Sequence, residues 1–306
     1  MTGTTIAQAI PIAISPILTR MYTPEDFGMF ALYMSVASIL SVIATGRYEL
    51  AIMLPKKDED AINIVALSIV ISFFVSFISF LIVFIFNAQI TNLLGSPEIS
   101  NWLYFIPITV LLTGVYQSFN YWSNRKKQYK RLAMSRVVQS GVAGSTNLGM
   151  GFAGFGSSGL ILGGVLGQFI STTILGRLVW NEDKDRFVHI KRLKIIVLAK
   201  KYINFPKFDL MASFINIFSN QVIHILFTTV FNPIIAGFYY LTQRIIGLPI
   251  SIVSKSIGDV FKEQASKDFK KMKNAKTIYI STFKKLFVLA LLPSLLLYFF
   301  SVNIFI

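Results

Sequence analysis

Charged side chains inside otherwise apolar stretches are the residues of this chain that can do chemistry. Arg244 lies eleven residues after Pro233, near the middle of an apolar stretch. An arginine at mid-membrane depth costs about 2.5–3.5 kcal/mol on insertion scales, so it needs an acidic partner, backbone carbonyls or an anionic substrate. Arg47 and Glu49 lie two residues apart where another apolar stretch ends. Arg47 either extends to the membrane surface or provides a cation at the mouth of a cavity.

Two apolar stretches also carry lines of polar residues at helical spacing. The first line contains Asp209, Ser213, Asn216, Asn220 and His224. The second contains Thr109, Thr113, Gln117, Asn120 and Asn124. Intervals of three and four put each set on one helix face. Each face either forms hydrogen bonds between packed helices or lines a polar path, and His224 is either a hydrogen-bonded histidine or a proton carrier.

Signatures of catalysis are missing from the sequence. Residues Gly154–Gly159 match G-x-G-x-x-G, but they join two apolar stretches instead of following a strand, so we interpret them as a tight turn. The chain has no G-x4-G-K-[ST] motif, and no His, Cys and Glu residues cluster with the spacing of metal ligands. We therefore predict no catalytic residue, no metal, no cofactor and no enzymatic activity.

The elements that must position the polar residues are transmembrane helices. Of the 306 residues, 54% are hydrophobic and 14% are charged, and the mean hydropathy is +0.63, whereas a soluble domain has about 25% charged residues. This composition, with no Cys, excludes a disordered chain, a disulfide scaffold and a soluble nucleic-acid binder. Most apolar stretches approach or exceed the roughly 20 residues that a membrane helix needs. They are Thr2–Thr19, Phe27–Ala44, Ile62–Phe86, Trp102–Trp122, Leu132–Phe152, Gly159–Val179, Leu210–Val230, Ile234–Ile257 and Leu286–Ile306.

The net charge of +15 is distributed in a way that predicts the orientation of these helices. Nearly all of the 29 Lys and Arg residues lie in alternate linkers, and only Arg20, Arg47 and Arg244 fall elsewhere. Because basic residues mark the cytoplasmic side, the N-terminus and the linkers after the even-numbered spans are predicted to be cytoplasmic. The basic, amphipathic stretch Phe261–Lys285 is predicted to contact anionic lipid.

An internal repeat is indicated when the sequence is shifted by 209 residues. Residues Ile17–Leu32 then align with Leu226–Leu241, and Pro24 meets Pro233 while Gly28 meets Gly237. The alternative is a generic helical hairpin with Pro and Gly at its turn. A real repeat predicts two parallel six-helix lobes with a binding site between them. We expect the first lobe at residues 1–200 and a second, truncated lobe of three helices at 201–306, as in a fragment.

The residues Pro16–Leu32, followed by Arg47–Pro55 and Asp58–Ala61, resemble the polysaccharide biosynthesis proteins. These are the lipid-linked oligosaccharide (O-antigen) flippases of the multidrug/oligosaccharidyl-lipid/polysaccharide exporter superfamily. The resemblance continues more loosely through four later segments, Tyr129–Ala133, Asn204–Phe208, Asn232–Pro233 and Tyr240–Pro249. It implies an all-α polytopic protein of the bacterial cytoplasmic membrane, here with about nine transmembrane helices.

The resemblance also implies outward transfer of undecaprenyl-diphosphate-linked oligosaccharide by alternating access, for lipopolysaccharide or another surface polysaccharide. Implied partners are this lipid-linked substrate, membrane lipids and polysaccharide assembly proteins, with no nucleic acid. Cations of the central cavity would meet the diphosphate, and amides would meet sugar hydroxyls. The expected substrate contacts are Arg47, Arg244, Arg20, Gln117, Asn120, Asn216 and Asn220, and the ion-coupling candidates are His224, Asp209 and Glu49.

Three alternatives stay open at this point. A cation-coupled multidrug exporter of the same superfamily should carry an acidic residue well inside a span of the first lobe, whereas Glu49 lies at the edge of one. A membrane polymerase or glycosyltransferase should have a large loop with catalytic residues, but the longest predicted outer loop, Asn87–Asn101, has Glu98 as its only charge. The third alternative is an inactive, truncated remnant.

Overall fold

The computed structural model describes residues 2–244, 247, 279–284, 286–287 and 291. The chain divides into two compact units, Met1–Thr242 and Gln243–Ile306. In the second unit, residues 279–284 are helical. The predicted span 234–257 is described, as helix, only at residues 234–244 and 247. The basic stretch 261–285 and the predicted span 286–306 lie largely outside the described residues, so the predictions made for them stay predictions. The boundary expected at residue 200 also stays a prediction.

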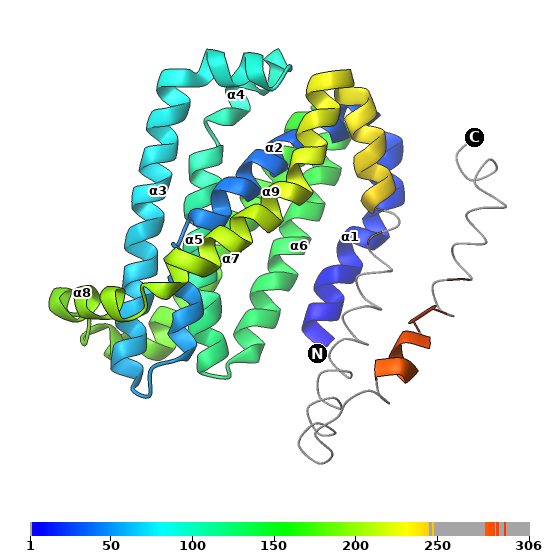
Figure 1. Cartoon of the computed structure of the whole chain (residues 1–306). Helices are drawn as coiled ribbons and strands as arrows, with labels where there is room; N and C mark the ends of the chain where they lie inside the picture. Colours follow the sequence, from blue (N-terminus) through cyan, green and yellow to red (C-terminus); the bar gives the residue numbers. More distant parts are fainter. Residues whose placement is uncertain (1, 245–246, 248–278, 285, 288–290, 292–306) are drawn as a thin grey trace. The chain divides into compact units, whose positions relative to one another are not determined.

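The first unit is a bundle of long helices, shown in Figure 1. In chain order it contains α1 (Thr2–Met21), α2 (Pro24–Ile43), the 3-10 helix η1 (Tyr48–Met53), α3 (Asp58–Leu93), η2 (Pro97–Ile99), α4 (Ser100–Leu103), α5 (Ile106–Arg125), α6 (Tyr129–Phe152), α7 (Ser157–Phe187), α8 (Arg192–Lys201), the π-helix η3 (Phe205–Asp209), α9 (Leu210–Leu226) and the π-helix η4 (Phe227–Phe231). Residues 233–242 continue as a helix. No residue of the described ranges is in a strand, which confirms the all-α prediction.

The apolar stretches of the sequence coincide with these helices. Among the described residues, four helices are long and apolar enough to cross a membrane: Pro24–Ile43, Asp58–Leu93, Ser157–Phe187 and Phe205–Phe231. The bent pair Pro97–Leu103 and Ile106–Arg125 makes a fifth if it is one span. The helices α1 and α6 occupy two more of the predicted spans, and each is shorter in its apolar part or more polar. The protein is therefore a multi-pass membrane protein.

The two copies of the internal repeat begin their helices in the same way. Thr23 caps α2, because its hydroxyl accepts the amide proton of Asp26 at 3.2 Å while the Asp26 carboxylate accepts the Thr23 amide proton at 2.9 Å. At the equivalent position Asn232 accepts the amide proton of Ile235 at 2.9 Å. Proline follows each cap, where its fixed φ suits a helix start. The two aligned segments thus share a capped helix start, as the repeat predicts, and the repeat itself stays a prediction.

The same two helices cross at the aligned glycines. A Cβ on Gly28 would lie 1.8 Å from the carbonyl oxygen of Pro233, and one on Gly237 would lie 1.7 Å from that of Pro24. Each copy thus presents the same residues to the other, which is the reciprocity of a two-fold contact. The missing side chains allow the two backbones to touch, and this contact agrees with the predicted parallel repeat.

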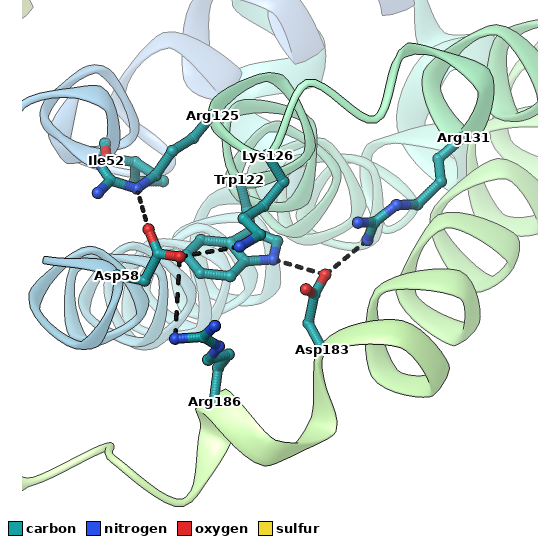
Figure 2. A network of polar contacts seen from close by, with 8 residues as sticks. All are labelled: Ile52, Asp58, Trp122, Arg125, Lys126, Arg131, Asp183 and Arg186. Carbon is teal, nitrogen blue, oxygen red and sulfur yellow. Dashed lines mark hydrogen bonds and ion pairs between the residues drawn. The ribbon is translucent and has the colours of Figure 1, made fainter.

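The predicted basic linkers of the first unit, which lie before α3, between α5 and α6 and after α7, meet at one end of the unit. Acidic residues there bind several of their basic side chains (Figure 2). Asp58, at the start of α3, accepts hydrogen bonds from Arg125 at 3.0 Å and Lys126 at 2.9 Å. Buried Asp183 of α7 accepts from Arg131 at 2.8 Å and from the Trp122 indole at 3.1 Å. The ends of α3, α5, α6 and α7 are therefore tied together, and this confirms that these linkers share one side.

Candidate functional site

A polar cavity of about 580 Å³ lies between α2, α5 and α9. One cation, Arg47, faces it among its lining residues, together with amide and hydroxyl side chains. Its polar lining consists of Ser38, Ser41, Arg47, Thr109, Thr113, Gln117, Ser213 and Asn216, and its apolar lining of Met34, Ala37, Val42, Ala212 and Ile217. This composition suits a ligand that has one anionic group and several hydroxyls.

Arg47 reaches the cavity because the chain breaks sharply after α2. Gly46 has a φ of +58° and Arg47 a φ of +62°, two consecutive left-handed residues that end one helix and begin η1. A non-glycine residue in this region is strained and is usually held in place by its surroundings. Here η1 is held by Tyr48, whose hydroxyl donates to the Ala199 carbonyl at 3.0 Å, and by Arg125, which donates to the Ile52 carbonyl at 3.1 Å.

Two carboxylates hold the Arg47 guanidinium. Its Nε donates to Oδ2 of Asp209 at 2.7 Å, and its Nη1 donates to Oε1 of Glu49 at 3.2 Å. The Glu49 side chain is 1% exposed, whereas that of Asp209 is 40% exposed. Thr45 donates to the other oxygen of Glu49, and Ser213 donates to Asp209 at 3.4 Å. The cation is therefore fixed from its own segment by Glu49 and, from the residue just before α9, by Asp209.

Burial raises the pKa of the Glu49 carboxyl above its usual value of 4.5. The nearby Asp209 charge acts in the same direction, while the Thr45 hydrogen bond and the charge of Arg47 oppose it. The hydroxyl of Tyr121, on α5, also interacts electrostatically with Glu49, Arg47 and Asp209. Glu49 lies in η1, between the spans α2 and α3. It therefore holds its proton more tightly in the native protein than in the unfolded chain.

This difference predicts how the stability depends on pH. Because the native state binds more protons above pH 4.5, Glu49 stabilises the fold below that pH, and the contribution is lost as the pH rises through the raised pKa. We predict that the free energy of unfolding of the Glu49→Gln variant falls less than that of the wild type when the pH rises from about 4.5 to about 8. Unfolding in mixed detergent micelles at a series of pH values measures this, and parallel curves for the two proteins would contradict it.

The structure brings together only some of the predicted site residues. Arg47, Gln117 and Asn216 line the polar cavity, and Asp209 and Glu49 bind Arg47. The predicted residues that do not line it are Arg20, exposed at the end of α1; Asn120, bonded to Asn124; Asn220, which donates to the Asn216 carbonyl; and His224. Arg244 belongs to the second unit, and its contact with substrate stays a prediction.

His224 and Asp209 lie at opposite ends of α9. Fifteen residues separate them, which is about 22 Å along an α-helix. His224 is buried against Tyr239 and Tyr240, with ring centroids at 5.1 Å and 6.1 Å. The two residues therefore cannot form a single ion site, and each stays a separate prediction for ion coupling.

One comparison of the chain with known proteins finds a match. A family model described as polysaccharide biosynthesis protein matches residues 17–306. The chain belongs to this polysaccharide biosynthesis protein family. No curated protein and no solved structure matches the chain. Membership assigns the protein to polysaccharide biosynthesis or transport, in agreement with the resemblance carried by the Pro16–Leu32 segment.

Four residues that line the polar cavity were not among the predicted substrate contacts. Ser38 and Ser41 of α2 line it, as do Thr109 and Thr113 of α5. The serines are three residues apart in an apolar helix, a spacing that places them on one face and could have identified them. The threonines lay on the predicted polar face of α5, but only the amides Gln117 and Asn120 of that face were expected to bind substrate.

Proposed function

We propose that the protein flips undecaprenyl-diphosphate-linked oligosaccharide outward across the bacterial cytoplasmic membrane, for O-antigen or another surface polysaccharide. It acts as a transporter without enzymatic activity, by alternating access, and an ion gradient or the membrane potential supplies the energy. The N-terminus is cytoplasmic, because the basic linkers gather at the end of the bundle where the chain begins. Family membership supports a role in polysaccharide biosynthesis or transport. The residues that line the polar cavity support a substrate with an anionic group and several hydroxyls.

The observation that carries the proposal is that, among the described residues, Arg47 is the one cation that lines the polar cavity, beside hydroxyls and amides. Arg47 offers a planar set of donors that binds phosphate oxygens in pairs. Gln117 and Asn216 offer amides that donate to and accept from sugar hydroxyls. The isoprenoid tail would stay in the lipid, where an apolar chain is most stable.

The polar cavity does not favour the multidrug exporter. A cation-binding exporter needs an acidic residue inside a span of the first lobe, whereas none of the cavity-lining residues from α2 and α5 is acidic. The two carboxylates nearby, Glu49 and Asp209, are both bound to Arg47. This arrangement suits an anionic head group better than a cationic drug.

The proposal is tested with the chain reconstituted in vesicles that contain a polyprenyl-diphosphate-linked oligosaccharide. Exposure of the sugar on the opposite leaflet is measured with a glycosidase that cannot cross the membrane. We expect Arg47→Ala to slow flipping at least about tenfold, because it removes charge-assisted hydrogen bonds to the diphosphate. Arg47→Lys should be intermediate, since lysine keeps the charge and loses the planar fork.

Arg177→Ala is the matched control, because Arg177 is exposed on α7 and does not line the cavity. It removes the same charge and should flip at the wild-type rate. If Arg47→Ala flips the substrate at the wild-type rate, Arg47 does not bind the diphosphate and the proposed site is wrong. Vesicles that extrude cationic dyes and leave the sugar lipid in place would favour the drug exporter, and inactivity in both assays would favour the remnant.

A further inference from the structure

Two carboxylates bind the guanidinium of Arg47. Of its two partners, Glu49 follows it by two residues, is buried and is fixed by Thr45, so it moves with Arg47. Asp209 comes from 162 positions further along the chain and has a 40% exposed side chain. A partly exposed ion pair contributes little to stability. Asp209 is therefore the partner that an incoming anion can replace.

The position of Asp209 also favours exchange. It ends the π-helix η3 and begins α9, and such π segments are rare and are often found at functional sites. Asp209 also lines a second cavity, of about 380 Å³, with Asn204, Phe205 and Phe208. Asp209 thus both binds Arg47 and lines this open hollow at the surface of η3. When it leaves Arg47, it has an open space to enter.

We propose that Asp209 is an internal counter-anion that occupies Arg47 until a diphosphate displaces it, so that substrate binding releases α9 from η1. This rests on the proposed function, because it takes the diphosphate as the ligand of Arg47. A diphosphate carries more charge than a carboxylate and offers several oxygens to the guanidinium, so it wins the exchange. Release of Asp209 removes the ion pair that links the start of α9 to Arg47, next to η1. The rest of α9 stays in contact with α2 through the hydrogen bond from Ser35 to Gln221, and η1 stays held by Tyr48 and Arg125.

The exchange predicts that removal of the Asp209 charge tightens anion binding. If the Asp209–Arg47 pair is closed in about nine molecules of ten, its loss lowers the apparent Kd about tenfold. The probe is inorganic pyrophosphate, titrated by calorimetry into the purified chain. We expect Asp209→Asn to bind it about tenfold more tightly than the wild type, and Asp185→Asn to bind it as the wild type does. Asp185 is exposed, and the Asp185→Asn substitution changes the net charge by the same amount as Asp209→Asn.

A second measurement follows the release of α9. The chain has no Cys, so two introduced cysteines can be spin-labelled without interference. Met53 of η1 and Met211 of α9 are about half exposed and suit labelling. In the wild type, pyrophosphate should lengthen or broaden the distance between the two labels. In Asp209→Asn, the long or broad distribution should be present before pyrophosphate is added.

The outcomes separate the inference from the function on which it rests. If Arg47→Ala binds pyrophosphate as well as the wild type does, the diphosphate site at Arg47 is wrong, and the inference falls with it. If Arg47→Ala loses binding but Asp209→Asn binds no more tightly than the wild type, only the inference is overturned. A label distance that pyrophosphate leaves unchanged in the wild type also overturns it.

Discussion

Replacing Gly28 with alanine is expected to force apart the two helices that begin the repeat copies and to destabilise the protein markedly. The new Cβ would lie 1.8 Å from the Pro233 carbonyl oxygen, and backbone atoms cannot rotate away as a side chain does. Overpacking of this kind costs about 1–3 kcal/mol, and occasionally more. This contact between two backbones should fall at the upper end. The unfolding midpoint in detergent measures it.

Gly141→Ala is the matched control for this prediction. A Cβ on Gly141 meets nothing within 4 Å, and the residue lies inside α6. Alanine there should stabilise the helix by about 0.5–1 kcal/mol. If Gly28→Ala unfolds at the same midpoint as Gly141→Ala, the crossing does not have the tight geometry described.

The reciprocal glycine provides a further test of the two-fold contact. Gly237→Ala should cost about as much as Gly28→Ala, because each Cβ meets the proline carbonyl of the other copy. The double variant should cost less than the sum, since helices already separated by one methyl group leave room for the second. Additive costs would show that the two glycines do not share one contact.

This crossing was predictable from sequence only in part. The alignment of Pro24 with Pro233 and of Gly28 with Gly237 identified the equivalent positions. The pattern predicted a common turn at the ends of two spans, because Pro and Gly restrict or free the local backbone. Direct contact between the two copies depends on how distant helices pack, and no local rule specifies that.

The polar cavity was also predictable only in part, because spacing along one helix gives a polar face but does not show how helices pack. Arg47, Gln117 and Asn216 were singled out because charged and amide side chains are costly in lipid. The family resemblance then implied that they contact the substrate. Asn220 shares the predicted face with Asn216 and yet does not line the cavity. The helix face is a property of spacing, whereas the part of it that meets a cavity depends on where the helices diverge.

The distribution of basic residues predicted the orientation of the helices, but it did not predict that these residues also form ion pairs. In the structure, Arg125, Lys126 and Lys194 are bound by the acidic residues at the start of α3. Periodicity cannot predict these pairs, because the partners lie more than 60 positions apart. The acidic run Asp58–Asp60 therefore holds together the linkers that the charge count had placed on one side.

Asp183→Leu is expected to have the largest effect of any single change at this end of the bundle. Asp183 and Arg131 have side chains less than a tenth exposed, and the same carboxylate oxygen also accepts the indole proton of fully buried Trp122 (Figure 2). Removing one partner of a buried ion pair costs about 3–5 kcal/mol, because the other charge stays buried without compensation. Glu182, 3.2 Å from Arg131 Nε and largely solvated, can offset only part of this cost.

The double variant Arg131→Met with Asp183→Leu distinguishes a buried charge from simple loss of packing. Replacing both members of a buried pair by apolar residues is often neutral or stabilising, so most of the loss should be recovered. The Trp122 indole would still lack its acceptor, which leaves a cost of about 1–3 kcal/mol. Lys130 is exposed and precedes Arg131, so Lys130→Ala should leave the free energy of unfolding unchanged. If the double variant is as unstable as Asp183→Leu, packing around Trp122 holds this end together, and the ion pair does not.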